Sequence, residues 1–309
     1  MPPVTHAPSP ARARTLGGSP HLAVAAVVRR RTPLWAVILI ALLVWAVGNL
    51  AVSITAGRGG ASALTSALAF APALVIGYGL RVLLIWGWVA RFEGRRFRTL
   101  GFPRGHGLAR AGGGFLAGLA LFGLVMLVFV ATGTLTPDVA RPGLQGVAAL
   151  SGVALLLLGW LVVGTSEEML YRGFVLQGLG ARRWPWLGVA VSSLLFAATH
   201  ISAWGSPLAV LNLALFGVLA SLYALREGGL WGVCGLHVGW NWVQGSVFGL
   251  AVSGNDVPGG ALLDLRADGP SLLTGGSFGA EASPAATVVL LLGVALTRLL
   301  RPAPPVAEA

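Results

Sequence analysis

Long apolar runs separated by short polar breaks dominate the chain. Eight such runs occur, and each approaches the ~20 residues that a helix needs to cross a bilayer core of ~30 Å. Their approximate ranges are 33–56, 62–90, 111–133, 147–179, 185–203, 207–225, 229–251 and 284–300. Gly and Pro, which are typical of turns, mark the breaks. The pattern predicts an all-α, polytopic membrane bundle of about eight transmembrane helices.

The remaining segments are polar or rich in turn residues. Residues 1–31, rich in Ala, Pro, Ser and Arg, are predicted to be a disordered basic cytoplasmic tail. The helical domain is expected over 32–303, and residues 304–309 form a short C-terminal tail. The first apolar run and the tail before it are both too long for a signal peptide. We therefore interpret that run as a retained transmembrane helix.

Composition supports a membrane protein. The chain of 309 residues is 56% hydrophobic and only 10% charged, whereas a soluble domain is about 25% charged. The net charge is +11, and every basic residue is Arg. These arginines lie in short loops between apolar runs and in no nucleic-acid motif, so we expect no nucleic-acid partner. The single cysteine, Cys234, excludes a disulfide framework.

The arginines also predict the orientation. Cytoplasmic loops of membrane proteins carry an excess of basic residues. If the N-terminus is cytoplasmic, sixteen arginines in tails and loops fall inside and three fall outside, namely Arg58, Arg141 and Arg266. This bias predicts an N-in, C-in topology. The all-Arg, Ala/Gly-rich composition favours the cytoplasmic membrane of a prokaryote as the location of this multi-pass protein.

Few ionisable residues lie deep within the apolar runs. Because such residues are costly at membrane depth, each is a functional candidate. Glu167 and Glu168 are the acidic residues placed this way, and His200 and His237 are the histidines. Glu167 precedes the turn at Arg183 by sixteen residues, and His200 follows that turn by seventeen. At 1.5 Å per residue, both lie ~25 Å from the turn, so we expect them at one depth.

Residues four apart on a helix share a face. Three pairs in the second half of the chain have this spacing: Glu168 with Arg172, Phe196 with His200, and His237 with Asn241. Pairing of Glu168 with Arg172 lowers the free-energy cost of burying their two charges. Glu167 is rotated by ~100° from Glu168 and can therefore face another helix.

These motifs resemble those of the CAAX-protease and bacteriocin-processing family, also called the CPBP or Abi family. Its pattern is Glu-Glu-x-x-x-Arg, then Phe-x-x-x-His, then His-x-x-x-Asn. Here the three motifs span 167–172, 196–200 and 237–241, and the resemblance covers roughly residues 150–250, within a core of about 147–251. It implies an all-helical, metal-independent intramembrane glutamate endopeptidase that needs no cofactor.

The resemblance also implies roles for individual residues. Glu167 and His200 are expected to activate a water molecule, while His237 and Asn241 bind the oxyanion. The supporting residues are Glu168, Arg172 and Phe196. The implied partners are the lipid bilayer and a membrane-associated protein or peptide substrate. Prenylated CAAX proteins, bacteriocin leader peptides and membrane-anchored regulators all remain open.

Other intramembrane protease chemistries lack their motifs. The sequence contains no His-Glu-x-x-His and no intramembrane Asp pair, and no Gly-x-Ser-x-Gly-like serine lies within an apolar run. Two alternatives stay open. A divalent metal bound by Glu167, His200 and His237 is one, because such three-ligand sets hold catalytic zinc. The other is a non-catalytic immunity or scaffold protein, because a shared fold does not guarantee activity.

Overall fold

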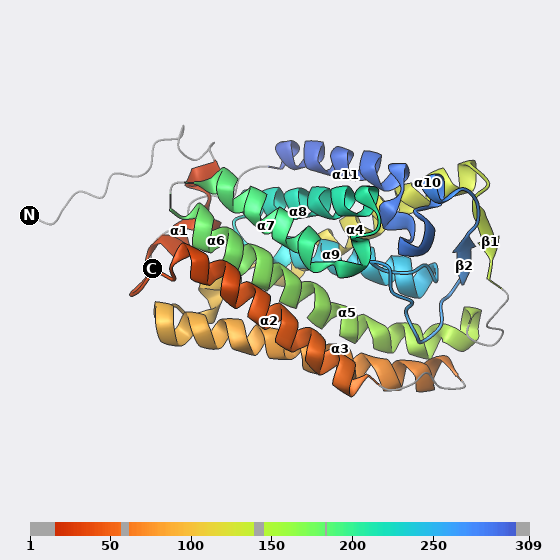
Figure 1. Ribbon diagram of the computed structural model, residues 1–309, viewed down its shortest axis with the longest axis horizontal. Coiled ribbons are helices and arrows are strands. Elements are labelled where there is room, and N and C mark those ends of the chain that lie inside the picture. The colour runs from red at the N-terminus through yellow and green to blue at the C-terminus, as the bar shows by residue number, and fades with distance from the viewer. Residues whose placement is uncertain (1–15, 57–61, 139–144, 183, 301–309) are drawn as a thin grey trace, which may run out of the picture.

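The computed structural model describes residues 16–56, 62–138, 145–182 and 184–300, and within these ranges the chain is a helical bundle (Figure 1). The helices are α1 (Pro20–Ala26), α2 (Leu34–Thr55), α3 (Ala63–Trp88), α4 (Gly107–Ala131), α5 (Leu150–Glu168), α6 (Gln177–Gly180), α7 (Pro185–Thr199), α8 (Pro207–Glu227), α9 (Trp231–Trp242), α10 (Ser271–Thr274) and α11 (Pro284–Leu296). Every predicted apolar run is helical in this bundle.

Three of these helices continue as wider π-helical segments. These are Val89–Glu93 after α3, Met169–Leu176 between α5 and α6, and Val243–Val247 after α9. Such segments are rare and often occur at functional sites. Met169–Leu176 directly follows the motif residue Glu168, and Val243–Val247 begins two residues after Asn241.

The helices differ in length. Five of those described are long and apolar enough to cross a membrane, comprising α2, α3, α4, α5 with its continuation, and α8. The other three predicted spans are shorter: α7 and α11 are apolar helices of 10–17 residues, and α9 has 12 residues before its π-helical end. The chain is therefore a multi-pass helical membrane protein, and three of its eight apolar helices are short.

Helix α9 lies at the centre of the bundle, and residues 232–241 are all buried. Glycines let α4 approach it closely. A methyl group added at Gly114 of α4 would overlap the carbonyl oxygen of Gly232, and one added at Gly235 would overlap that of Ala111. Small residues permit this kind of close packing between membrane helices. As a result, α9 carries its motif residues into the protein interior.

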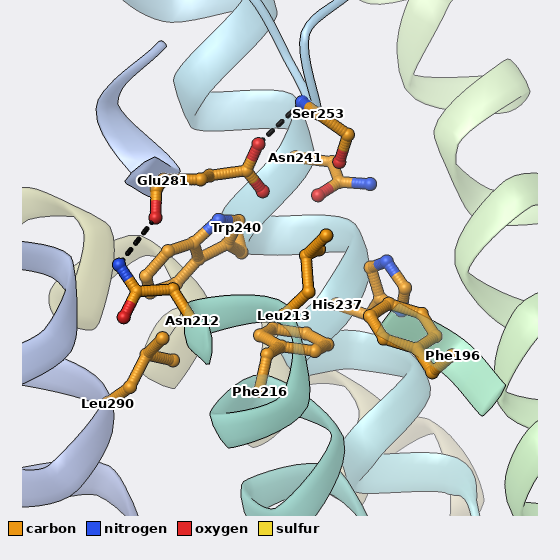
Figure 2. A pocket seen from close by; sticks show the side chains of 10 residues that line it. All are labelled: Phe196, Asn212, Leu213, Phe216, His237, Trp240, Asn241, Ser253, Glu281 and Leu290. Carbon is orange, nitrogen blue, oxygen red and sulfur yellow. Dashed lines mark hydrogen bonds between the residues drawn. The ribbon is translucent and has the colours of Figure 1, made fainter. Parts of the chain in front are cut away.

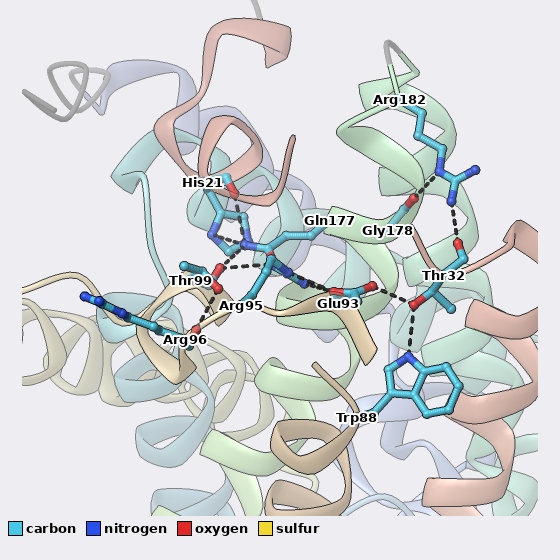
Figure 3. A network of polar contacts seen from close by, with 10 residues as sticks. All are labelled: His21, Thr32, Trp88, Glu93, Arg95, Arg96, Thr99, Gln177, Gly178 and Arg182. Atoms are coloured by element: carbon cyan, nitrogen blue, oxygen red, sulfur yellow. Dashed lines mark hydrogen bonds and ion pairs between the residues drawn. The ribbon is translucent and has the colours of Figure 1, made fainter. Parts of the chain in front are cut away.

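A polar network joins the segments at one end of the bundle (Figure 3). Arg95 donates to Gln177 at 2.9 Å and to Glu93 at 2.8 Å. Gln177 in turn donates to the backbone oxygen of His21 at 2.9 Å, and Thr32 donates to Glu93 at 2.6 Å. The N-terminal residues 21–32, residues 93–95 and Gln177, which are distant in sequence, therefore meet at this end.

The prediction of a disordered tail through residue 31 is wrong for residues 16–31, while residues 1–15 lie outside the described residues. Ser19 caps α1 and donates to the backbone oxygen of Leu225 at 2.6 Å. The ring of His21 is fully buried, and its Nε2 donates to the backbone oxygen of Arg172 at 3.0 Å. Burial lowers the pKa of His21 to about 4. Tertiary contacts order this segment, although its composition is typical of disorder.

The opposite end of the bundle is capped by loops. Strand β1 (Leu135–Pro137) pairs antiparallel with β2 (Leu265–Ala267), which lies in the long loop between α9 and α11. In Figure 1 this sheet lies at the far end of the bundle from α1 and α6. The Ser202 hydroxyl donates to the Ser253 carbonyl oxygen at 2.8 Å, which joins the same loop to the turn after α7. The predicted tail 304–309 lies outside the described residues.

Candidate functional site

A cavity of about 490 Å³, here called the central cavity, lies inside the bundle. Its walls come from α2, α3, α5, the end of α7, α9 and the loop after α9. Glu167, His200, His237 and Asn241 all line it. The structure thus brings together the four side chains that the motifs single out, and the volume falls within the ~300–1,000 Å³ usual for ligand sites.

Glu167 lies between a cation and an imidazole. Its Oε1 is 3.6 Å from Nη1 of Arg81, and its Oε2 is 3.6 Å from Nε2 of His237. Both the Glu167 and Arg81 side chains are buried. Glu167 and the neighbouring Glu168 therefore face different partners, as their ~100° separation on a helix requires.

Glu168 joins two of the motifs. Its Oε1 accepts from Nη1 of Arg172 at 2.9 Å, the i,i+4 pair expected from the sequence, and from Nδ1 of His237 at 2.8 Å. The guanidinium of Arg172 also lies 4.7 Å from the ring centre of Phe196. Glu168, Arg172 and Phe196 thus form one buried cluster behind the cavity, and this cluster fixes the ring of His237.

His200 lies where α7 ends. Its Nδ1 is 2.7 Å from the backbone oxygen of Phe196. A carbonyl oxygen can only accept, so Nδ1 carries the proton in this contact and Nε2 of the neutral ring keeps its lone pair. The ring centres of Phe196 and His200 are 4.6 Å apart, which places the aromatic ring against the imidazole as the spacing predicts.

Asn241 follows His237 by one helical turn on α9. Both side chains are buried, and both line the central cavity. The helix after Asn241 widens into its π-helical end. The cavity therefore presents an imidazole and an amide from one face of one helix.

Arg81 is a cavity residue that the motifs do not include. It donates to Oδ1 of Asn49 at 2.7 Å, and its guanidinium carbon lies 4.1 Å from the ring centre of Tyr78. All three residues line the cavity from α2 and α3. An arginine within an apolar span is itself a signal of function, but the sequence does not reveal that its partner is Glu167.

Glu281, from the loop between α9 and α11, is a buried residue beside the site that the motifs do not include. The backbone N–H of Ser253 and, at 3.2 Å, Nε2 of Gln244 donate to its carboxylate. Burial raises the pKa of Glu281. With His237 and Asn241 it lines a second, smaller cavity of about 20 Å³ (Figure 2), which is enough for a water molecule. No local sequence pattern predicts that Glu281 is buried at the site, because the loop folds back to the site only in the tertiary structure.

Metal-ligating side chains do not cluster in the part of the chain that the structure describes. No group of three His, Cys, Asp or Glu side chains there is arranged to hold a metal ion. Glu167, His200 and His237, the ligand set considered from the sequence, form no such group.

A comparison with family models finds a match to the segment that contains all three motifs. The family model for type II CAAX prenyl endopeptidase Rce1-like proteins matches residues 149–243. An uncharacterized 24.3 kDa protein of Escherichia coli is 36% identical over 80 residues, which cover 25% of this chain and 36% of that protein. The alignment thus spans about a third of that relative. No solved structure gives a significant match.

Proposed function

We propose that this chain is an intramembrane endopeptidase, because residues 149–243 match the family model for type II CAAX prenyl endopeptidase Rce1-like proteins. It hydrolyses a peptide bond in a membrane-associated polypeptide, and its own side chains supply the chemistry without a metal ion. One observation carries the proposal. Glu167, His200, His237 and Asn241 reach a single cavity from α5, the end of α7 and α9, and all four lie within the matched segment.

The water-activating groups are His200 and Glu167. The Phe196 carbonyl holds the proton of His200 on Nδ1, so Nε2 can accept a proton from a water molecule in the cavity. General bases of this kind contribute typically ~10²–10⁴-fold to a rate. Glu167 lines the same cavity and accepts hydrogen bonds, so it orients the water and stabilises the proton that His200 takes up.

The oxyanion-binding groups are His237 and Asn241. With Nδ1 of His237 donating to Glu168, the ring exposes Nε2 to the cavity, and Nε2–H can donate when the ring carries two protons. The Asn241 amide supplies a second donor one turn away. A single donor aimed at a developing oxyanion lowers the barrier by about 3 kcal/mol in known cases.

The reaction balances without another reactant. Water loses a proton to His200, and its oxygen bonds to the carbonyl carbon of the peptide. The carbonyl oxygen becomes the oxyanion bound by His237 and Asn241. The C–N bond then breaks, the proton on His200 passes to the leaving nitrogen, and a carboxylic acid and an amine result.

The test compares membrane proteomes of cells that carry wild-type protein, Glu167→Gln, His200→Ala or the control Asp268→Asn. Asp268 is exposed at the loop-capped end, so its replacement leaves the cavity intact. We expect one or more uncleaved precursors to accumulate in the first two variants at wild-type abundance of the protein, and none in the control. Normal processing by purified Glu167→Gln would reject the proposal.

Two further outcomes distinguish the alternatives. If exhaustive chelation abolishes cleavage and a divalent ion restores it, the peptidase is metal-dependent. If the Glu167→Gln and His200→Ala variants restore a deletion phenotype fully, the chain acts as a non-catalytic partner.

A further inference from the structure

The two ends of the helix bundle differ in arginine content. The described arginines that precede α2, connect α3 to α4, or lie at the ends of α6, α8 and α11 gather at one end. Contacts such as the donation from Arg29 N–H to the Glu93 carbonyl and from Arg226 to the Leu300 carbonyl tie these segments together. At the opposite end, the described loops hold Arg266 alone, on β2.

The central cavity opens at the arginine-poor end. Among its lining residues, those that are exposed are Ser53, Ile201, Ser202, Asn255 and Asp256. They belong to the last turn of α2, the turn after α7 and the loop after α9, all of which lie at the end that the β1–β2 sheet caps. These five residues are called the rim below.

The path from the cavity to the arginine-rich end is closed by packing. Residues 166–177, which run from beside Glu167 toward that end, are all buried. Tyr171 and Phe174 belong to the same buried core as Leu100 and Leu230. Beyond them, His21 of the docked α1 contacts the backbone of Arg172. A polypeptide cannot reach Glu167 from this side without unpacking the core.

Arginine-rich loops of membrane proteins face the cytoplasm, which places the rim on the other side. We propose that the central cavity takes its substrate from the extracytoplasmic side of the membrane. The proposal rests on the proposed function and narrows its substrate class. The substrate is a membrane-anchored polypeptide whose cleaved bond lies in the outer half of the bilayer or just outside it.

The cavity wall fits such a substrate. Trp45, Phe70 and Trp160 line it from α2, α3 and α5, so an apolar segment next to the membrane anchor finds aromatic surface on its way to the site. The rim carries one carboxylate, Asp256, and no arginine. A protein anchored on the cytoplasmic leaflet, with its cleavage site in the cytoplasm, is excluded from this entrance.

Cysteine labelling in intact and inverted membrane vesicles tests the entrance directly. The background is the Cys234→Ala variant, since Cys234 is the chain's single cysteine and is buried. Single cysteines replace Ser202 or Asp256 on the rim, Leu272 on α10, and Arg104 in the loop before α4. Leu272 is 73% exposed, lies at the rim's end of the bundle and does not line the cavity. The probe is a charged maleimide that does not cross membranes.

We expect Ser202→Cys, Asp256→Cys and Leu272→Cys to react in right-side-out vesicles, and Arg104→Cys to react only after inversion. Labelling at Ser202→Cys abolishes cleavage of the precursor, whereas labelling at Leu272→Cys leaves it unchanged. Reaction of the rim cysteines from the same side as Arg104→Cys overturns the proposal. Unimpaired cleavage by a fully labelled Ser202→Cys protein overturns it too.

The side from which the cysteines react with the maleimide is measured independently of substrate cleavage. If the wild-type protein cleaves nothing, the proposed function fails, while the side on which the rim cysteines react still decides where the cavity opens. If cleavage occurs but the rim reacts from the arginine-rich side, the peptidase stands and this inference fails.

Discussion

Individual buried charges at the site are paired, either with a neighbouring helix or one turn along the same helix. Arg81 of α3 meets Glu167 of α5, and Glu168 meets both Arg172 and His237. An unpaired charge in an apolar interior costs several kcal/mol, so these pairs are what permits ionisable residues at membrane depth. The arrangement gives Arg81 a positioning role, because it orients the carboxylate of Glu167 without being part of the motifs.

Replacing Arg81 tests that role. Arg81→Gln leaves Glu167 without its cation, and breaking a buried pair from one side costs about 3 kcal/mol or more. We expect a lower free energy of unfolding in detergent and reduced cleavage. The double variant Arg81→Gln/Glu167→Gln should be more stable than the sum of the single changes implies. Strict additivity of the two effects on unfolding would show that the residues are uncoupled.

At the scale of elements, the short helix α1 shows that part of the N-terminal segment is folded against the bundle. Its docking depends on His21, whose buried ring donates to the Arg172 carbonyl and whose backbone oxygen accepts from Gln177. Arg95 is the charged group that acts on this ring from the neighbouring segment. Because the His21 ring is neutral in the folded state, its protonation disfavours the docking of α1.

The docking of α1 is therefore expected to depend on pH. The pKa of His21 falls from 6.5 to about 4 in the folded state, so the unfolded segment binds a proton first. Stability from α1 docking is present above pH 6.5 and is lost as the pH falls toward about 4. We expect backbone amides of α1 to exchange hydrogen faster at pH 5 than at pH 7, relative to amides of α9. In His21→Gln this difference should shrink, and an unchanged difference would contradict the role of His21.

At the scale of the whole molecule, the family-matched segment does not form the cavity alone. Residues 149–243 supply the motif residues, but Trp45, Asn49, Phe70 and Arg81 come from helices that precede it. The loop after α9 lines the cavity with Asn255 and Asp256, and it brings Glu281 to the site. The complete cavity therefore requires segments from both outside the match and within it.

A truncation measures this dependence. A chain that begins at residue 147 lacks α2, α3 and α4, so Glu167 loses Arg81 and α9 loses its glycine-mediated contact with α4. We expect this chain to show no cooperative thermal unfolding in detergent and no cleavage. The matched control begins at Leu16 and keeps every described element. Full activity of the shorter chain would show that the first three long helices are dispensable.

Much of this architecture is local enough to be seen in the sequence. Apolar runs predicted the helices because hydrophobicity and turn residues act over a few neighbouring positions. Helical spacing predicted the Glu168–Arg172 pair and the contact between Phe196 and His200, because residues four apart share a face. The short spans and the π-helical segments were missed, since packing of neighbouring helices decides where a regular helix widens or stops.

By itself, the sequence determined that Glu167, Glu168, His200 and His237 lie within apolar runs, how the motif residues are spaced along each helix, and how unevenly arginine is distributed between the loops. Only the tertiary structure decided that Arg81 contacts Glu167 and that Glu168 binds His237. It also decided that Glu281 returns to the site and that α1 docks at the arginine-rich end of the bundle. These partners are separated by long stretches of chain. The way each helix turns toward its neighbours is set by side-chain packing across the bundle, which no local pattern encodes.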